Sequence, residues 1–325
     1  MRIRLYCISM VFTFAALGAV DLNAQEKVLR IDAPQTDPAI ESVEGPHLAI
    51  YNPQVALNHR LFLFFVGTNG KPERSLNLES AFADWGYHVI ALDYENHVAT
   101  VVCAHSTDSA CFDHYREANI MGALVSDKIA VSRDDSILNR LNKLLAYLVM
   151  QDPDGGWGEF FADGQPVWNR IVVAGHSQGA GHAAYLGKMF PVDEVLMFSG
   201  PQDYFADLDM PAPWLARPSA TPPSRYFAFL NVADPYNVQH QIANCSVLMD
   251  VAHPAAPLIQ PGEVIKGNAQ IFLNDADPQH AHGSTLLPEF SNVREYFARI
   301  GAEETSLKRG LSPEPRPPLQ SGHPQ

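Results

Sequence analysis

Basic residues are scarce in this sequence. It contains 22 Lys and Arg against 36 Asp and Glu, which gives a formal net charge of −14 at pH 7. Such a charge balance argues against nucleic acids and anionic membrane surfaces as partners, because both carry negative charge themselves. The sequence also lacks internal repeats, and 46% of its 325 residues are apolar. That content is enough to bury one large core, so we expect a single globular domain.

Cysteine is also rare, with four in the whole chain, and no pair has the spacing of a zinc site. We therefore expect no structural metal. Cys103 and Cys111 lie eight residues apart in a polar segment, where a disulfide would hold the loop in place. Cys245 would then remain as a buried free thiol.

The longest apolar run lies near the N-terminus, at residues 5–20, and two basic residues, Arg2 and Arg4, precede it. Residues 22–24 (LNA) provide a small-residue cleavage site. The run is short for a membrane span, and no basic stop-transfer cluster follows it. We therefore interpret residues 1–24 as a cleaved signal peptide. This predicts a secreted or periplasmic protein without membrane contact after cleavage, in a compartment where disulfides form.

The most informative motif is a serine between glycines, GHSQG at residues 175–179. The apolar run at 171–174 before it predicts a buried strand, and the Ala- and Gly-rich segment 178–188 predicts a closely packed helix. A serine at a sharp strand-to-helix turn stands above the sheet edge, and the N–H groups of the following helix can bind a developing oxyanion. Ser177 is therefore the candidate nucleophile, and an ordinary Gly-rich turn is the alternative.

Strands alternate with helices along most of the chain, which predicts an α/β fold with a mostly parallel central sheet flanked by helices. This places Ser177 at the carboxyl end of a strand, where open α/β sheets carry their sites. Asp134 or Asp135 is expected to cap the clearest helix. The expected strands are 47–51, 61–66, 87–92, 171–174, 194–198, 226–231 and 270–273; the expected helices are 75–85, 137–148, 178–188 and 288–300; and loops are expected at 93–113 and 151–167.

The end of the chain is rich in proline and charge, which predicts a disordered tail over residues 303–325. The globular domain is accordingly expected to span residues 25–302.

The serine motif, the order of the elements and the chain length resemble the α/β-hydrolase superfamily of serine hydrolases, over roughly residues 45–300. Secreted bacterial esterases are the nearest likeness. The resemblance implies an α/β-hydrolase fold and a catalytic triad. The acid and the histidine then follow the serine in that order, each in a loop after a later strand.

Asp234 is the preferred acid, because it lies just past an apolar strand, and Asp203 in the loop after the preceding strand is the alternate. His282 is the preferred base, because the adjacent Gly283 lets the chain bring the imidazole inward, and His280 is the alternate. His253 is a third candidate, although it precedes the last strand. The His-x-His pair lacks further ligands at helical or hairpin spacing, so we expect no metal there.

The resemblance assigns the oxyanion hole to the N–H groups of Gln178 and of Thr68, in the loop after strand 61–66. That loop reads VGTNG here, whereas many lipases and esterases have HGGG. His176 and His182 flank the serine and are expected to have structural roles. Residues 204–225 are long and apolar enough to cap the site, or they form a surface loop.

These features predict an exported serine hydrolase that cleaves a small or polymeric carboxylic ester through an acyl-enzyme. The alternatives are a peptidase or amidase with the same triad, and a non-catalytic binding protein on a hydrolase scaffold. No cofactor is expected, because the glycines at 175–181 are not followed by the acidic residue of a dinucleotide site.

Overall fold

The computed structural model describes residues 26–310, and the expected signal peptide lies outside this range. Within the described residues, a sheet of eight strands has the order β1-β2-β4-β3-β7-β8-β11-β12. The pairs β1–β2 and β2–β4 are antiparallel, and the other neighbours are parallel. The strands are Lys27–Ile31 (β1), His47–Tyr51 (β2), Leu61–Phe65 (β3), His88–Ala91 (β4), Ile171–His176 (β7), Glu194–Phe198 (β8), Tyr226–Asn231 (β11) and Ile271–Asn274 (β12).

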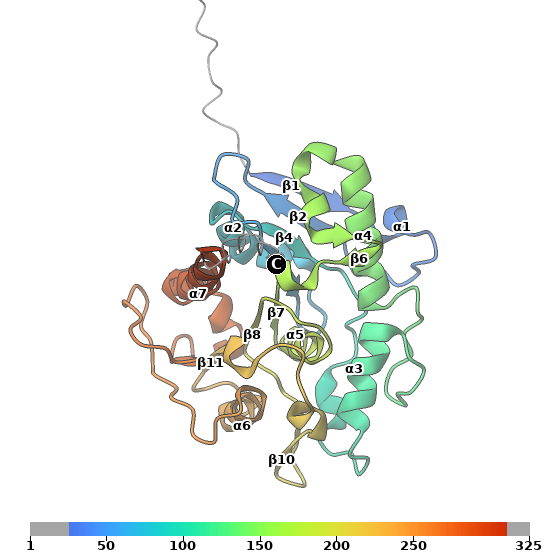
Figure 1. The fold of residues 1–325 in the computed structure, drawn as a ribbon. Coiled ribbons are helices and arrows are strands. Elements are labelled where there is room, and N and C mark those ends of the chain that lie inside the picture. The colour runs from blue at the N-terminus through green and yellow to red at the C-terminus, as the bar shows by residue number, and fades with distance from the viewer. Residues whose placement is uncertain (1–25, 311–325) are drawn as a thin grey trace, which may run out of the picture.

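Helices cover both faces of this sheet. Figure 1 shows α2 and α7 on one side and α3, α4 and α5 on the other. Two short hairpins pair β5 with β6 and β9 with β10. The helices are Ala33–Thr36 (α1), Leu76–Asp84 (α2), Cys111–Met121 (α3), Ile137–Gln151 (α4), Gln178–Met189 (α5), Val238–Met249 (α6) and Ser291–Gly310 (α7), and the hairpin strands are Phe161–Ala162 (β5), Gln165–Pro166 (β6), Tyr204–Phe205 (β9) and Met210–Pro211 (β10).

The centre of the sheet is packed tightly enough to require glycine at the start of α5. Every residue of β3 is fully buried, as expected for a parallel strand covered on both faces. A Cβ atom at Gly179 would lie 2.1 Å from the carbonyl oxygen of Phe65, and one at Gly175 would lie 2.2 Å from the Gly179 backbone. Both glycines of the serine motif are thus needed for α5 to lie directly on β3 and β7.

The expected α/β fold and most expected elements are confirmed. The strands predicted at 47–51, 194–198 and 226–231 coincide with β2, β8 and β11. Besides the four-residue α1, two longer helices were not predicted, α3 and α6. Their sequences are rich in small and polar residues, and α3 buries charged side chains that are paired elsewhere in the fold, so neither has a clear apolar stripe.

Two boundaries differ from the expectation. The N-cap of α4 is Ser136, whose hydroxyl accepts from the Asn139 N–H at 3.3 Å, so the prediction of Asp134 or Asp135 is wrong. The Asp135 carboxylate instead binds Arg140 at 2.9 Å. Helix α7 continues to Gly310, past the expected domain boundary at 302, because no proline interrupts the chain before Pro313. Residues 311–325 of the expected tail lie outside the described residues.

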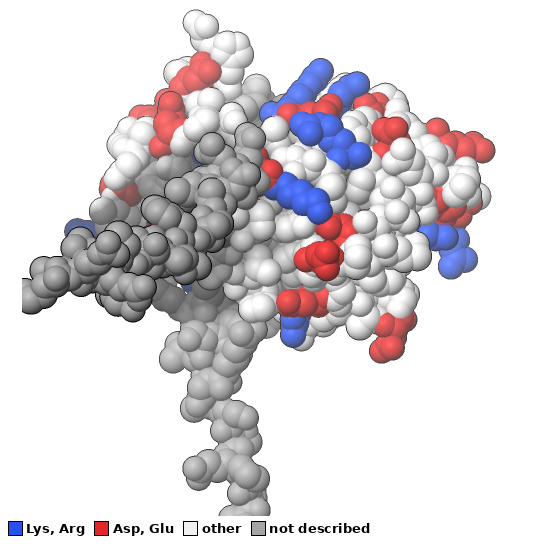
Figure 2. Space-filling model, turned by 90° about the horizontal axis from the view of Figure 1, so that it is seen from above, with Lys and Arg blue, Asp and Glu red and all other residues white. Residues whose placement is uncertain are grey.

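The cysteines are arranged as the sequence predicts. A disulfide joins Cys103 to Cys111, the first residue of α3, and Cys245 is a buried free thiol whose pKa is raised by burial. Among residues 26–310, no helix is long and apolar enough to cross a membrane. Acidic and basic side chains are interspersed on the face seen in Figure 2.

Candidate active site

Ser177 lies at the turn between β7 and α5. Its backbone has φ 57° and ψ −120°, a conformation that costs energy for any residue other than glycine. Its N–H donates to the carbonyl of Phe198 on the neighbouring strand at 2.8 Å. A Cβ atom at Gly67 would lie 3.0 Å from the Ser177 Cβ, so the loop after β3 passes directly beside this serine. A strained serine held at the sheet edge in this way is the arrangement of a nucleophile elbow.

Asp234 and His282 are hydrogen-bonded to each other. The Nδ1–H of His282 donates to Oδ2 of Asp234 at 2.9 Å, and the Tyr236 N–H donates to Oδ1 at 2.9 Å. Burial raises the pKa of Asp234, but the hydrogen bond and charge of His282, together with hydrogen bonds from Tyr236 and Gln241, lower it, and the net pKa lies below its usual value. The carboxylate is therefore ionised, and it sets both the orientation and the tautomer of the imidazole.

Ser177 and His282 line one cavity of about 270 Å³, together with the loop at 67–70. No hydrogen bond joins the two side chains in this structure. Among the described residues, Nε2 of His282 is buried without a hydrogen-bond partner, and the Ser177 hydroxyl accepts from Nε2 of Gln202 at 3.2 Å. Because Gln202 donates, the serine proton stays free for another acceptor. Contacts between a catalytic serine and its base are often long before substrate binds.

The backbone of His282 is held by two further donors. Nε2–H of His176 donates to the His282 carbonyl at 2.8 Å, and the Ser199 hydroxyl donates to the same oxygen at 2.7 Å. Burial and the neighbouring His282 lower the pKa of His176 to about 4, so its imidazole is neutral at pH 7. The structural role expected for His176 is thus specific, since it fixes the segment that carries the candidate base.

A buried network of side-chain hydrogen bonds also holds the segment that carries His282. The Asn231 amide at the end of β11 donates to Oδ1 of Asn274 at 2.7 Å and to the Ser284 hydroxyl at 2.8 Å. Ser284 in turn donates to Asn274 at 2.9 Å. Since Ser284 belongs to the short 3₁₀ segment Ala281–Leu286 that contains His282, the ends of β11 and β12 are tied to the candidate base. The sequence offered one signal for this network, an asparagine at the end of each strand.

Thr68 and Gln178, the expected oxyanion-hole residues, lie next to each other. Oγ1 of Thr68 donates to Oε1 of Gln178 at 2.8 Å. The Gln178 N–H belongs to the first turn of α5, where backbone N–H groups have no acceptor within the helix. Both residues are thus beside Ser177, on the loop and the helix that the oxyanion-hole assignment requires.

The alternate site residues have other partners. Asp203 is fully buried, but Arg116 binds it at 2.5 Å and 3.0 Å and the Trp214 indole donates to it at 2.9 Å. His280 is exposed and contacts Asp277 at 3.1 Å, and His253 is exposed on the segment before β12. Neither alternate histidine lines the Ser177 cavity. His280 immediately precedes the 3₁₀ segment Ala281–Leu286 and its side chain is exposed, whereas His282, two residues later, lies within that segment and is partly buried.

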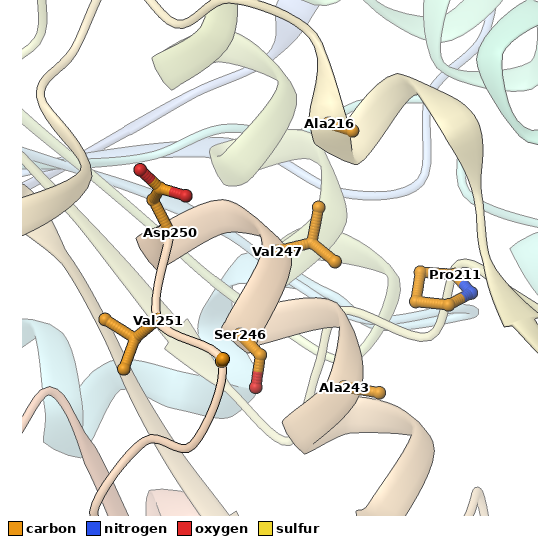
Figure 3. A pocket seen from close by; sticks show the side chains of 8 residues that line it. Pro211, Ala216, Ala243, Ser246, Val247, Asp250 and Val251 are labelled. Carbon is orange, nitrogen blue, oxygen red and sulfur yellow. The ribbon is translucent and has the colours of Figure 1, made fainter.

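A larger groove of about 590 Å³ lies away from these residues, between α6 and the segment that follows β10. Figure 3 shows Ala243 and Val247 of α6 facing it, with Pro211 and Ala216 across from them. Residues 204–225 contribute to this groove and not to the Ser177 cavity. Residues 204–225 were expected either to cap the site or to form a surface loop. Since none of them lines the Ser177 cavity, the structure does not show them as a cap.

One group among the described residues brings three metal-ligand atoms together, Glu44, Glu95 and His97. These residues do not line the Ser177 cavity.

No family model matches this chain, and no curated protein matches it. Solved structures do resemble it. Esterase B from Lactobacillus rhamnosis, inhibited by a tributyrin phosphonate, has a TM-score of 0.48 and 10% identity over 88% of each chain. The esterase of Pyrobaculum calidifontis has a TM-score of 0.41 and 14% identity, with 87% of this chain and 86% of the esterase covered. Oligopeptidase B from Leishmania major has a TM-score of 0.43 and 10% identity, with 86% of this chain and 37% of the peptidase covered.

At these scores the likenesses say nothing about what this chain acts on. Its own topology is more informative. The sheet is parallel except for β2, which is antiparallel to both of its neighbours; the strained serine follows β7, and Asp234 and His282 follow β11 and β12. This chain has an α/β-hydrolase fold.

Proposed function

We propose that this protein is a serine hydrolase that cleaves a carboxylic ester through an acyl-enzyme. One observation carries the proposal. The only hydrogen bond of the His282 ring within the described residues is to Asp234, and its other nitrogen is unpaired in the cavity that Ser177 lines. An oriented imidazole with a free acceptor beside a strained serine is what nucleophilic catalysis requires.

The steps follow from these positions. Oγ of Ser177 attacks the ester carbonyl while Nε2 of His282 takes its proton. The N–H groups of Gln178 and Thr68 stabilise the negative charge that develops on the carbonyl oxygen. The C–O bond to the alcohol breaks as His282 returns the proton to the leaving oxygen. Water then attacks the acyl-serine by the same route, which releases the acid and restores the hydroxyl.

Hydrolysis of 4-nitrophenyl acetate and butyrate, together with labelling by a fluorophosphonate, tests the proposal. We expect turnover of both esters and a labelled peptide that contains Ser177. The Ser177→Ala variant should lose the label and at least about 10³-fold in kcat. Turnover that persists in Ser177→Ala, or a label on another residue, would contradict the assignment.

The same assay separates the other readings. Faster cleavage of butyryl 4-nitroanilide than of the ester would favour an amidase, since fold and triad do not set the leaving group. A binding protein would show no turnover of either compound and no label. Export is part of the proposal and agrees with the Cys103–Cys111 disulfide. Its test is the N-terminal sequence of the mature protein, expected to begin at Gln25.

A further inference from the structure

We infer that the substrate of this site carries an anionic group, with the chemistry of a carboxylate, and that Arg74 binds it. This inference rests on the proposed ester hydrolase and adds the substrate class. Arg74 lies on the short 3₁₀ segment Pro72–Ser75, just after the loop that carries Thr68.

Arg74 and the candidate nucleophile line the same cavity. Arg74 lines the cavity of about 270 Å³ that contains Ser177 and His282. It also lines an adjoining cavity of about 110 Å³, and Gly67, Gly70 and His176 are shared by the two. A substrate bound at Ser177 can therefore extend past the oxyanion loop and reach the guanidinium.

The guanidinium of Arg74 has no carboxylate partner within the described part of the chain. Among the described residues, Arg74 forms no ion pair, although acids outnumber bases in this chain. Its sequence neighbour Glu73 is bound by Arg30 at 3.1 Å. Most other described arginines are paired with acids, including Arg60, Arg116, Arg140, Arg170, Arg217 and Arg299. Arg74 is thus among the few described arginines without an acidic partner, and it lines the cavity that contains Ser177.

The lining of the adjoining cavity defines the rest of the ligand. Phe64, Val66 and Leu286 provide apolar surface, and Lys71 adds a second cation without an ion pair among the described residues. A guanidinium matches a carboxylate with two parallel N–H donors, and an apolar wall suits a short hydrocarbon or aromatic spacer. The ligand is accordingly an ester with an acidic group a few carbons away from the scissile carbonyl.

Two pairs of esters test this, and in each pair the carboxylate of one ester is replaced by a neutral group in the other. On the acyl side the pair is 4-nitrophenyl hemiadipate and 4-nitrophenyl hexanoate. On the alcohol side it is 4-acetoxybenzoate and 4-acetoxybenzamide. The measured quantity is the kcat/KM of the charged ester divided by that of the neutral one, for the wild type, Arg74→Gln and the matched control Arg133→Gln. Arg133 is also exposed and lacks an ion pair among the described residues, but it does not line either cavity.

We expect the ratio of one pair to fall about five- to tenfold in Arg74→Gln and to stay at the wild-type value in Arg133→Gln. Raising NaCl should lower the wild-type ratio and leave that of Arg74→Gln nearly constant. Ratios that are equal in the wild type and in an active Arg74→Gln, for both pairs, overturn the inference while the ester hydrolase stands. If the wild type turns over none of the four esters, the proposed function fails and this inference fails with it.

Discussion

Two buried aspartates follow neighbouring strands of the sheet and have different partners. Asp203 follows β8 and Asp234 follows β11, which pairs with β8. The side chains of both are fully buried. Asp203 is bound by the guanidinium of Arg116 at 2.5 Å, whereas Asp234 accepts from the imidazole of His282 at 2.9 Å.

The difference shows how the partner decides what a buried carboxylate can do. Arg116 is permanently charged, and it also donates to the carbonyl of Gln178 at 2.8 Å. The Arg116–Asp203 pair therefore ties the start of α5 to the loop after β8. An imidazole gains and loses a proton near neutral pH, so the carboxylate beside it can stabilise a transient charge.

The largest expected effect is on turnover. Asp234→Asn keeps the shape of the side chain but removes the charge that stabilises the imidazolium, and its amide can stabilise the wrong tautomer of His282. We expect kcat for 4-nitrophenyl butyrate to fall by about 10³- to 10⁴-fold, with the melting temperature near that of the wild type. The matched control is Asp277→Asn, which changes the exposed acid beside His280. A similar loss in the control, or full activity in Asp234→Asn, would remove Asp234 from the site.

The second effect is on stability. Asp203→Asn leaves the Arg116 guanidinium buried without a counter-charge, and we expect the free energy of unfolding to fall by about 3–5 kcal/mol. Urea denaturation measures this. The double variant Asp203→Leu with Arg116→Leu removes both charges and should be more stable than Asp203→Asn. If Asp203→Asn instead keeps the wild-type free energy of unfolding but loses turnover, then Asp203 acts in catalysis and its assignment to stability is wrong.

The smallest effect is on the pH dependence of stability, and it concerns His176, which donates to the carbonyl of His282. The pKa of His176 is about 4 in the folded chain and about 6.5 when unfolded, so between these values the unfolded chain binds the additional proton. The stability that His176 contributes is therefore fully present above pH 6.5 and is lost as the pH falls towards 4. Relative to His176→Gln, the wild type should lose about 1.4 kcal/mol per pH unit in this window.

Chemical denaturation of both proteins at half-unit pH steps measures that difference. The exposed His280→Ala serves as the control, and its stability should stay parallel to that of the wild type. A constant difference between the wild type and His176→Gln across the window would show that His176 is not held neutral by the fold.

Most of the sheet could be predicted from the sequence, because runs such as Leu61–Phe65 and Glu194–Phe198 are apolar and bounded by turns. Helices α3 and α6 could not, since their buried faces include Arg116 and Asn244, which are buried only because distant residues bind them. For the same reason, the sequence does not predict that Gln202 donates to Ser177 or that Ser199 donates to the carbonyl of His282. Each belongs to a loop whose course depends on the neighbouring strands.

The sequence by itself determined the turn at Ser177, because the apolar strand, the two glycines and the small residues of α5 act over a few neighbouring positions. It also limited the acid and the base to a few candidates. Only the tertiary structure shows which of these candidates lie next to each other. Asp234 lies 48 residues from His282, and His176 lies 106 residues from the carbonyl that it binds. Contacts over such separations depend on how the strands are ordered in the sheet, and local sequence does not encode that order.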